Sequence, residues 1–458
     1  MDLEQGFCYA SQAMLINEKR IHHLNRSPMG AGPIIYWMSR EQRVRDNWGL
    51  LHARQLAGHD RALVVCFCLA PDFLGATLRQ YDFMLRGLSE VEHDLGKLSI
   101  PYVPCLGAPA ESVLRLVDDM GAGAVVTDFD PLRIKQEWQR SVARSLSIPL
   151  VEVDGHNVVP ARSVSDKQEY AARTIRPKIH RLSSEFLEEF PPLEPPAVTL
   201  PLFPATDWEA VRDSLTMDST VAPVDLKPGE AAAHAALNLF AHKGIHDYAT
   251  RRNDPVREAT SRISAYLHFG QLAPQRAALA VAASGRGDGQ AAFLEELIIR
   301  RELTDNFCLH NPDYDSLAGA PDWARKTLDE HRDDPRPFVY SHAQFDGAKT
   351  HSRLWNAAQT QLLKTGFMHG YMRMFWAKKI LEWSPTPEAA HATVVALNDR
   401  YQLDGRDPNG YVGALWSVAG LHDRPWKTRP IYGSVRYMNE NGCRRKFDVE
   451  AYINRWLG

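Results

Sequence analysis

Five apolar, β-rich runs alternate with amphipathic stretches in the first part of the chain, and this alternation constrains the fold most. The runs occupy residues 33–39, 62–69, 101–106, 123–129 and 149–155, and amphipathic stretches such as 41–58 and 77–98 lie between them. Strands that alternate with helices through short connections form a parallel sheet covered by helices. The sequence therefore predicts an α/β domain at residues 30–180, built on a parallel five-stranded sheet.

The predicted sheet is Rossmann-like in its alternation but lacks the dinucleotide-binding fingerprint. The first run is followed by "SREQR" (39–43), with neither G-x-G-x-x-G nor a Walker lysine loop. The glycines of "MGAGP" (29–33) precede the strand instead of following it. A ligand of this domain would therefore bind at the carboxyl ends of the strands by other means.

A proline-rich segment separates this domain from a second one. The stretch "EEFPPLEPPAVTLPLFPATDW" (188–208) has no sustained periodicity, so residues 181–228 are predicted to be an interdomain linker. From residue 229 to 458 apolar residues recur at three- and four-residue spacings, which predicts an all-helical domain. Residues 1–29 are polar and are predicted to form an extension ahead of the first strand.

Composition narrows the cellular setting. The sequence has no run of 18 apolar residues and no apolar core near its N-terminus, so neither a membrane span nor a signal peptide is expected. Six cysteines occur without a C-x-x-C pair, and Cys66 and Cys68 lie inside an apolar run on one face of a strand. Buried free thiols without a metal are expected, in a reducing intracellular compartment, the cytoplasm or the nucleoid if the protein is bacterial.

Charge is unevenly distributed along the chain. The formal net charge is −3, but residues 421–458 carry eight basic and four acidic residues. Such a surplus is usually a solvated face, and it is also what a phosphate-binding face needs.

Two tryptophans recur at helical spacing in "YMRMFWAKKILEW" (371–383). Trp376 and Trp383 are seven residues apart. In a helix both indoles would point the same way, about 20° out of line and roughly 10.5 Å apart along the axis. Aromatic residues at helical spacing are usually core, so from this segment alone packing and a further role both stay open.

Several stretches resemble the class II cyclobutane pyrimidine dimer (CPD) photolyases of the photolyase/cryptochrome flavoprotein family. They include "YWMSREQRVRDNW" (36–48), "RRNDP" (251–255), "RRELTDNFC" (300–308), "LNDRYQLDGRDPNGY" (397–411) and "RYMNENGCRRKFD" (436–448), and the resemblance spans residues 30–455. It implies a helical C-terminal domain that holds a U-shaped FAD in its reduced form, FADH−. It also implies light-driven repair of CPD lesions in UV-damaged DNA. Family members carry a deazaflavin or a folate as antenna chromophore in the N-terminal domain, whose lining residues the sequence does not identify.

The resemblance assigns a set of flavin-binding residues. A polar segment before an apolar helix matches the stretch that binds the FAD pyrophosphate, a role suited to hydroxyls and free N–H groups at a helix start. Without the resemblance, a plain helix cap would be the commoner interpretation of that segment. Asn398 is placed against flavin N5, and Arg373 pairs with Asp404 over the isoalloxazine ring, where a fixed positive charge favours the anionic reduced flavin. The other residues implied are Tyr248, Thr260, Ser261, Arg262, Ile263, Ser264, Arg406 and Asp407.

The tryptophan stripe acquires a role from the same resemblance. Trp376, Trp355 and Trp383 match the family's electron relay, with Trp376 nearest the flavin, Trp355 intermediate and Trp383 near the surface. The relay recharges an oxidised flavin under light and is not the repair reaction itself. A core-packing role is compatible with it, because one ring can do both.

Substrate residues are implied as well. A dimer inside a duplex cannot reach a buried flavin, so it must flip out into a pocket. Glu296 is the implied acid that hydrogen-bonds a dimer carbonyl, and Met374 and Trp416 are implied apolar contacts of the dimer. DNA-contacting residues, which position the strand without reading its sequence, are Arg252, Asn253, Arg300, Arg424, Trp426 and Arg436.

Three other functions compete with repair of CPD lesions. A cryptochrome-type blue-light sensor commonly carries a long polar tail, whereas this sequence ends at "YINRWLG" directly after the predicted domain. A (6-4) photolyase needs paired histidines, and His369 stands alone in the matching stretch. A thermal FAD oxidoreductase would need an NAD(P)H fingerprint, which the sequence lacks. CPD repair by a monomer is the function that the sequence favours.

Overall fold

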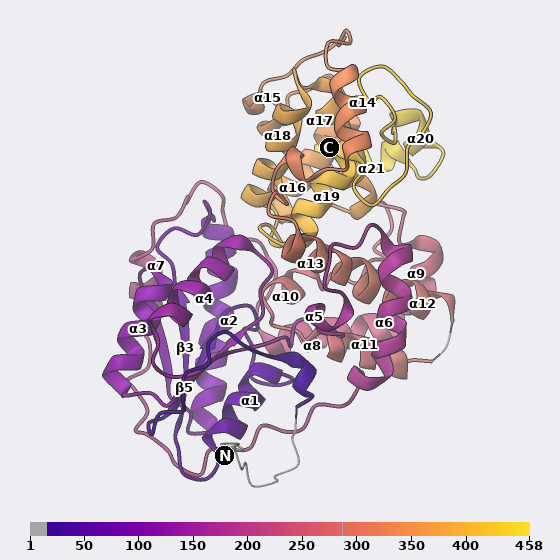
Figure 1. The fold of residues 1–458 in the computed structure, drawn as a ribbon. Coiled ribbons are helices and arrows are strands. Elements are labelled where there is room, and N and C mark those ends of the chain that lie inside the picture. Colours follow the sequence, from indigo (N-terminus) through magenta and orange to yellow (C-terminus); the bar gives the residue numbers. More distant parts are fainter. Residues whose placement is uncertain (1–15, 286) are drawn as a thin grey trace, which may run out of the picture.

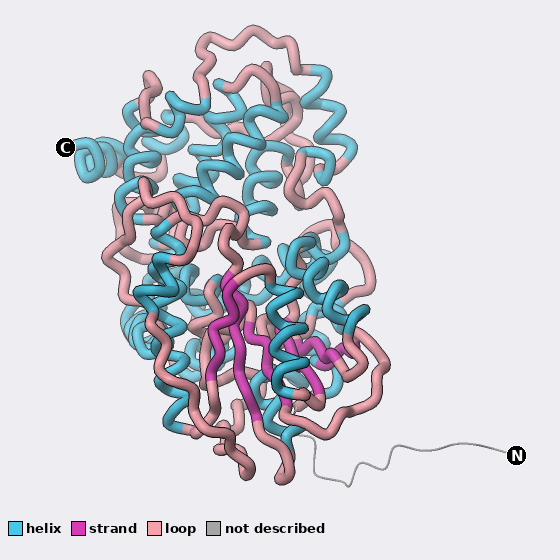
Figure 2. The backbone as a smooth tube through the Cα atoms, turned by 90° about the vertical axis from the view of Figure 1, so that its left-hand side faces the viewer, coloured by secondary structure: helices cyan, strands magenta, loops and turns pink. Residues whose placement is uncertain are grey.

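The computed structural model describes residues 16–285 and 287–458, and it has two parts (Figure 1). An α/β part is formed by the first half of the chain, and a helical part by the second half. Strands are confined to the lower half of the molecule in Figure 2, and helices fill the upper half. Cys8 and the first half of the predicted N-terminal extension lie outside the described residues.

The α/β part contains the five predicted parallel strands. They are β2 (Ile34–Met38), β3 (Leu63–Leu69), β4 (Tyr102–Leu106), β5 (Ala124–Asp128) and β6 (Leu150–Val153). Neighbouring strands pair in parallel in the order β6-β5-β2-β3-β4. The connecting helices are α1 (Trp48–Ala57), α2 (Leu78–Lys97), α3 (Pro109–Met120) and α4 (Arg133–Ser145). The prediction of this architecture from alternating apolar runs is confirmed.

The sheet has a sixth strand, which the prediction of a parallel five-stranded sheet did not include. After the short helix η1 (Glu18–Arg20), β1 (Ile21–His23) pairs antiparallel with β6, so the sheet is mixed and residues 21–23 belong to it instead of to a polar extension. Arg20 anchors this edge: its side chain is buried, donates to the backbone oxygens of Asp154, Asn157 and Val158, and reaches Gln275 Oε1 in the helical part. Three residues that include two histidines carry no strand periodicity, which is why the sequence did not reveal β1.

The predicted linker is partly helical. Helix α5 (Ala161–Val164) precedes α6 (Ala172–Phe186), which runs across the predicted boundary at residue 180, and α7 (Trp208–Asp213) lies within the predicted linker. The irregular stretch before α7 is fastened to α2, because Glu92 accepts hydrogen bonds from the Thr206 hydroxyl and the Trp208 indole N–H.

In the described residues beyond 228 the regular elements are helices, joined by loops. Its elements are α8 (Glu230–Leu239), the π-helix η2 (Phe240–Gly244), α9 (Ile245–Arg251), α10 (Ser264–His268), α11 (Pro274–Ala283), α12 (Asp288–Leu294), the π-helix η3 (Glu295–Arg300), α13 (Arg301–His310), the short η4 (Leu317–Gly319), α14 (Asp322–Glu330), α15 (His342–Asp346), α16 (Arg353–Thr365), α17 (Gly370–Trp383), α18 (Pro387–Tyr401), α19 (Pro408–Ala419), α20 (Glu440–Arg444) and α21 (Val449–Leu457). No helix in the described ranges is both long and apolar enough to cross a membrane.

Helix α17 is the central element of the helical part. It contacts α16, α18 and α19, and its apolar side chains belong to the core cluster that these helices share. A helix that is buried on nearly every side needs no polar face. Lys378 and Lys379 are buried in it all the same.

A buried ion pair joins the two parts of the molecule. Arg40, just after β2, forms a bidentate pair with Asp305 on α13, with N···O distances of 2.7 and 3.0 Å. The Asn157 amide donates to the same carboxylate at 3.1 Å. These contacts fix the helical part against the carboxyl ends of the central strands.

Candidate active site

A cavity of about 560 Å³, here the central cavity, opens among α9, η3 and α17–α19. That volume is within the range of cofactor and ligand pockets. It gathers residues from five separate stretches of the sequence. Those that the sequence predicted are Tyr248, Arg252, Asn253, Thr260, Glu296, Arg300, Arg373, Met374, Trp376, Asn398 and Trp416.

The acid predicted to meet the dimer is paired with a predicted DNA-contacting arginine. Glu296 lies on the π-helix η3, a type of element that occurs often at functional sites. Arg252 donates to Glu296 Oε1 at 2.8 Å, and its guanidinium lies 5.5 Å from the centre of the Tyr248 ring. The carboxylate therefore faces the cavity with one oxygen already held in place.

A second cavity, of about 200 Å³ and here the basic cavity, adjoins the first across an ion pair. Arg373 in the wall of the central cavity lies 3.6 Å from Asp404 in the wall of the basic cavity, so this predicted pair is present. Arg262, Ser264 and Lys364 also line the basic cavity, together with a second carboxylate, Asp225. Two cationic side chains and a hydroxyl are the donors that a phosphate group needs.

The backbone of the predicted pyrophosphate stretch is unusual. Arg262 has φ of +58°, a left-handed conformation that non-glycine residues adopt mainly at functional sites, and its guanidinium lies over the Phe367 ring. Helix α10, which follows, has only five residues. The Ile263 side chain is buried in the core, and Ser261 lines neither cavity. The stretch thus offers Thr260, Arg262 and Ser264 to the two cavities.

The three predicted relay tryptophans form a continuous chain of rings. Trp376 lines the central cavity and stacks on Trp355, with centroids 6.3 Å apart and planes 10° from parallel. Trp383 contacts Trp355 from a different direction, at 6.3 Å and 65°. The ring of Trp355 therefore bridges the two tryptophans whose seven-residue spacing placed them on one stripe.

Trp383 is less exposed than predicted. Only 3% of its surface is accessible, because His351 and Tyr340 cover it at centroid distances of 4.8 and 5.8 Å. The Tyr340 hydroxyl and His351 Nδ1 are hydrogen-bonded at 2.7 Å, and His351 is exposed. The outer end of the chain of rings is thus a buried indole under a thin aromatic cover, which sequence reasoning missed.

The side-chain amide of Asn398 lies close to the backbone of Gly410, a glycine of the cavity wall. The amide nitrogen donates to Asp399 Oδ1 at 3.1 Å, and Asn398 itself lines the central cavity. A side chain at Gly410 would meet this amide at 2.9 Å, whereas one at Gly370 or Gly413, also in the wall, would meet nothing within 4 Å. The lack of a side chain at Gly410 therefore leaves room for the Asn398 amide.

Two histidines line the central cavity, one more than the sequence indicated. His369 Nδ1 accepts from the Tyr371 N–H at 3.1 Å, and burial lowers its pKa to about 4, so the ring is neutral with its proton on Nε2. His422, which sequence reasoning missed, bonds the Tyr170 carbonyl through Nδ1. His369 and His422 line the same cavity, and no hydrogen bond or ring contact joins them within the described residues.

Two predicted flavin ligands, Arg406 and Asp407, do not line the central cavity. The buried Arg406 guanidinium donates to the backbone oxygens of Leu74, Gly75 and Asp399. Asp407 caps α19 and accepts from His268 Nδ1 at 2.9 Å. Both residues line a third cavity and not the central one. Their position follows from the loop 402–407, which turns its charged side chains toward the α/β part.

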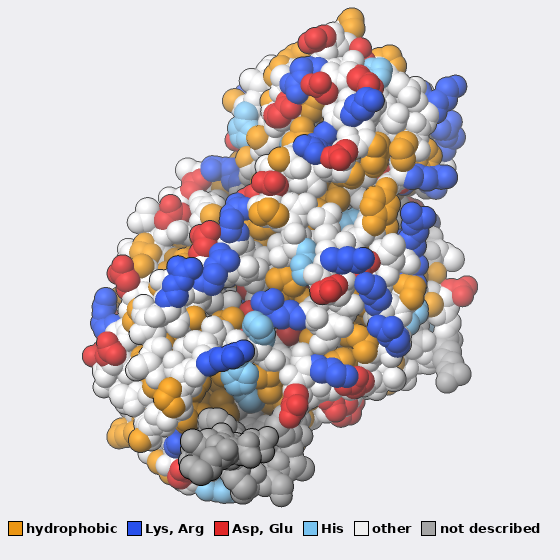
Figure 3. Space-filling model, viewed as in Figure 1, with side chains coloured by type: hydrophobic (Ala, Val, Ile, Leu, Met, Phe, Trp, Pro, Cys, Tyr) orange, Lys and Arg blue, Asp and Glu red, His pale blue; other side chains and the backbone are white. Residues whose placement is uncertain are grey.

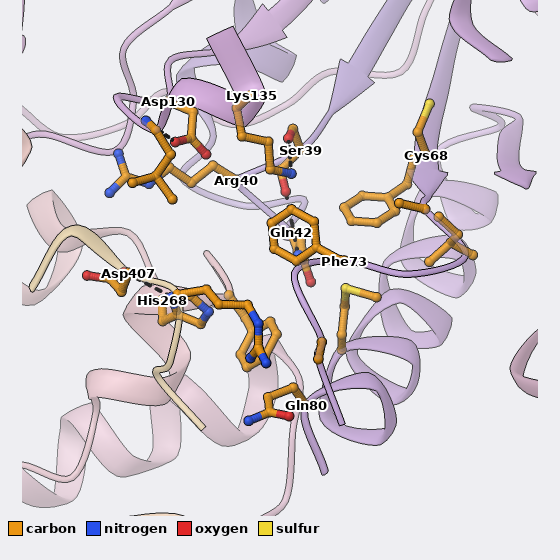
Figure 4. Close-up of a pocket in the computed structure, with 18 of the residues that line it drawn as sticks. Ser39, Arg40, Gln42, Cys68, Phe73, Gln80, Asp130, Lys135, His268 and Asp407 are labelled. Carbon is orange, nitrogen blue, oxygen red and sulfur yellow. Dashed lines mark hydrogen bonds and ion pairs between the residues drawn. The ribbon is translucent and has the colours of Figure 1, made fainter. Parts of the chain in front are cut away.

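The third cavity, here the junction cavity, lies between the two parts of the molecule (Figure 4). It is about 100 Å³ in volume and opens beyond the carboxyl ends of β2, β3 and β5, where the strand order reverses direction. Lys135 donates to Ser39 Oγ at 3.1 Å, and its ammonium lies 4.9 Å from the ring centres of both Phe73 and Trp138. Open α/β sheets bind their ligands at such a switch point.

The predicted DNA-contacting residues near the C-terminus lie on the loop that follows α19, where Arg424 and Trp426 are exposed and Arg436 is half-buried. Trp426 is 42% exposed, and the guanidinium groups of Arg436 and Arg424 lie 5.0 and 5.6 Å from the centre of its ring. Lys and Arg side chains also stand together over α20, on the right-hand edge in Figure 3. The basic surplus of this region is therefore a surface feature.

Comparison with known proteins identifies the fold. A cryptochrome from Synechocystis sp. PCC6803 superposes with a TM-score of 0.72 at 14% identity, over 94% of this chain and 89% of that one. An archaeal photolyase from Sulfolobus tokodaii gives 0.71 at 16% identity, over 93% and 90% of the two chains. The fold is thus that of the photolyase and cryptochrome flavoproteins.

Sequence comparison identifies the family. Residues 34–197 match the family model described as DNA photolyase. The chain is 49% identical over 426 residues to the deoxyribodipyrimidine photo-lyase of Potorous tridactylus, which covers 91% of this chain and 80% of the relative. The chain belongs to the DNA photolyase family.

Proposed function

We propose that this protein is a class II CPD photolyase, which repairs cyclobutane pyrimidine dimers in UV-damaged DNA by light-driven electron transfer from reduced FAD. One observation carries the proposal: a single cavity unites Trp376, Asn398, Glu296 and Trp416. These residues represent, respectively, the relay, the flavin contact, the acid and the lesion contact. A cryptochrome-type sensor would share the fold, but 49% identity to a photo-lyase favours repair.

The walls of the two cavities suit FAD. The central cavity has the volume and the planar Trp376 wall for a ring system, and the basic cavity has Arg262 and Lys364 for the phosphates. Arg373, between them, supplies positive charge that favours an anionic reduced ring, and Asp404 holds that guanidinium in place. When bound and excited by blue light, the flavin supplies the electron that opens the dimer.

The protein's own groups would receive and hold the lesion. Glu296 presents a carboxyl to the dimer carbonyls, and its salt bridge to Arg252 keeps it oriented until the lesion enters. Met374 and Trp416 give the cavity apolar contact surface that excludes water around the dimer. Arg424, Trp426 and Arg436, on the exposed loop, hold the strand from which the dimer has flipped.

Repair of a dimer-containing oligonucleotide, with reduced enzyme in light and in darkness, tests the proposal. Product is expected only in light. Glu296→Gln should slow repair by roughly ten- to a hundredfold, the size expected for loss of one positioned acid. Glu295→Gln is the matched control, since Glu295 occupies the same π-helix and pairs with Arg176 and Arg300 but does not itself line the cavity. Equal product in darkness, or equal loss in both variants, would contradict the assignment.

An antenna chromophore, a deazaflavin or a folate, is proposed to bind in the junction cavity. The position at the switch point, the flanking rings of Phe73 and Trp138, and the Lys135 ammonium suit a planar, electron-rich ligand. The similar S. tokodaii structure is described as holding two FAD molecules, with the implication of a novel light-harvesting cofactor. A cavity of about 100 Å³ is smaller than such a ligand needs, so the Phe73 side chain must move on binding.

Adding either chromophore to the holoenzyme tests this site. The action spectrum of repair should gain the absorption band of the chromophore that binds. Cys68→Trp, which fills the cavity wall, should abolish that gain while repair driven at the flavin band stays unchanged. A retained gain would place the chromophore elsewhere.

We expect a monomer, which sedimentation of the free protein and of its DNA complex would verify.

A further inference from the structure

Lys378 is an unexpected residue at the centre of the helical part. It lies on α17, has no exposed surface, and packs among core side chains where a lysine is rarely found. Its ammonium donates to the Ser417 carbonyl oxygen at 2.9 Å. The same ammonium lies 5.2 Å from the centre of the Trp416 ring. Burial of an amine requires compensation, and these two contacts of α19 provide it.

Lys378 begins an alternating row of cations and indoles that leads to the surface, here the cation–indole ladder. The Arg436 guanidinium also lies over Trp416, at 5.9 Å, and over Trp426, at 5.0 Å. Arg424 is the last member of this row, with its guanidinium 5.6 Å from the centre of the Trp426 ring. Its inner end is buried, Trp416 lines the central cavity, and its outer end is the exposed loop after α19.

We propose that Lys378 is a positioning residue for the lesion. Its ammonium fixes the Trp416 indole against the central cavity and couples that ring, through Arg436, to the surface that holds DNA phosphates. This inference rests on the proposed function, because it assigns Trp416 to the dimer and Arg436 to the strand. Lys378 itself touches neither flavin nor DNA, since it does not line the cavity.

The charge on Lys378 responds to its surroundings. Burial lowers the pKa of the amine to about 7, with a further lowering from the Arg436 charge, which Asp423 opposes. The other polar group against it is the Tyr432 hydroxyl, which donates to the Lys378 carbonyl oxygen and to Glu382. A DNA phosphate at Arg436 would offset the arginine's field and so raise the pKa of Lys378. Lesion binding should therefore take up a proton and weaken as the pH rises above about 7.

Lys378→Met tests the proposal, with Lys379→Met as the matched control. Lys379 is the next residue on the helix, but it pairs with Glu382 and lies over Trp383 and Tyr437, away from Trp416. The dissociation constants of the holoenzyme for a dimer-bearing and an undamaged duplex are measured at fixed salt between about pH 6 and about pH 8.5. Their ratio, the lesion preference, is the readout.

In wild type and in the control, the lesion preference should fall several-fold across this range. Lys378→Met should lower it by roughly five- to tenfold at the acid end and remove its pH dependence, with affinity for undamaged DNA within about twofold of wild type. A wild-type preference and pH profile in Lys378→Met would overturn the proposal. Should that variant not fold, Lys378→Arg decides, because a guanidinium stays charged across this range and the pH dependence must vanish, and its persistence overturns the proposal. A protein that binds lesions with this profile but repairs nothing in light would refute the proposed function and leave the ladder intact.

Discussion

The three tryptophans that are proposed to form the relay pack in the core and also contact one another as a chain of rings. Two indole N–H groups are fixed by hydrogen bonds, Trp376 to Gln359 Oε1 at 2.9 Å and Trp355 to the Trp376 carbonyl oxygen at 3.0 Å. These bonds hold the rings in the orientation that stacks them. The core therefore needs the three ring volumes, and electron transfer needs the particular ring edges and planes.

Substitution of the inner and outer tryptophans should separate the relay from the repair step. Trp376→Phe removes the ring at the central cavity, so photoreduction of oxidised flavin should nearly vanish. Trp383→Phe should allow the charge to separate and then recombine, which also lowers the net rate. Both variants, once chemically reduced, should still repair. Absorbance of the oxidised flavin under blue light measures the rate.

The control for this prediction is Trp323→Phe, on α14 and outside the chain of rings. A pure packing role predicts normal photoreduction in all three variants and a loss of stability of about 1–2 kcal/mol. Wild-type photoreduction rates in Trp376→Phe and Trp383→Phe would show that the electron enters by another route.

Individual residue positions were predictable only where local spacing or a literal motif fixed them. The Arg373–Asp404 pair and the Trp376 and Trp383 stripe are present as predicted. Arg406 and Asp407 occupy the same motif, yet they face the junction cavity, because a turn decides side-chain direction and spacing does not. The cover over Trp383 was also hidden, since Tyr340 and His351 come from a separate loop.

Among the elements, the antiparallel strand β1 depends on one side chain. Arg20 lies between the rings of Trp48 and Phe186 and satisfies backbone carbonyls that have few other donors. The buried carboxyl groups of Asp154, Glu41 and Glu302 are close enough to favour its charge, although burial itself lowers its pKa. β1 is thus stabilised by a buried polar network more than by its own three residues.

Arg20→Met should destabilise the protein strongly. The carbonyl oxygens lose their donors and the carboxylates lose a counter-charge, at a cost of about 3–5 kcal/mol. A lower urea midpoint measures the effect. Lys19→Met, which breaks an exposed ion pair with Glu185, is the neighbouring control and should change stability by less than about 1 kcal/mol. Equal midpoints in the two variants would show that β1 is held by other contacts.

Periodicity predicted the elements with long apolar runs and failed for the short ones. Four of the five parallel strands are nearly or wholly buried, so their apolar runs were visible, and only β4 is partly exposed. Helix α6, which crosses the start of the predicted linker, and helix α7 within it were missed, because prolines flank or interrupt them, as Pro177 does in α6.

On the scale of the whole molecule, charge distribution outweighs total charge. The chain carries a formal net charge of −3, but the exposed loop after α19 and the surface over α20 are basic. Phosphates respond to the local field within a Debye length, about 8–10 Å at physiological salt, and not to the distant acidic residues. A slightly acidic protein can therefore bind DNA.

Loss of both Arg424 and Arg436 should weaken binding to a dimer-bearing duplex. Each phosphate contact removed should lower the slope of log affinity against log salt by roughly 0.9. Arg325→Ala with Arg332→Ala is the control, because these exposed arginines pair with Asp322 and Glu388 on α14 and α18. A salt titration of affinity compares the two double variants, and an unchanged slope for the first would remove the loop from the DNA interface.

The anchoring of Arg20 also has a consequence for biosynthesis. Its guanidinium reaches Gln275, and Arg40 reaches Asp305, partners that leave the ribosome 255 and 265 residues later. At about 5–20 residues per second, the two arginines would wait roughly 13–53 s for them. The nascent α/β part therefore cannot complete its own interior until residues 275 and 305 of the helical part have been made. Its last polar contacts form only when the helical part emerges, so the first-made half of the chain is finished by the second.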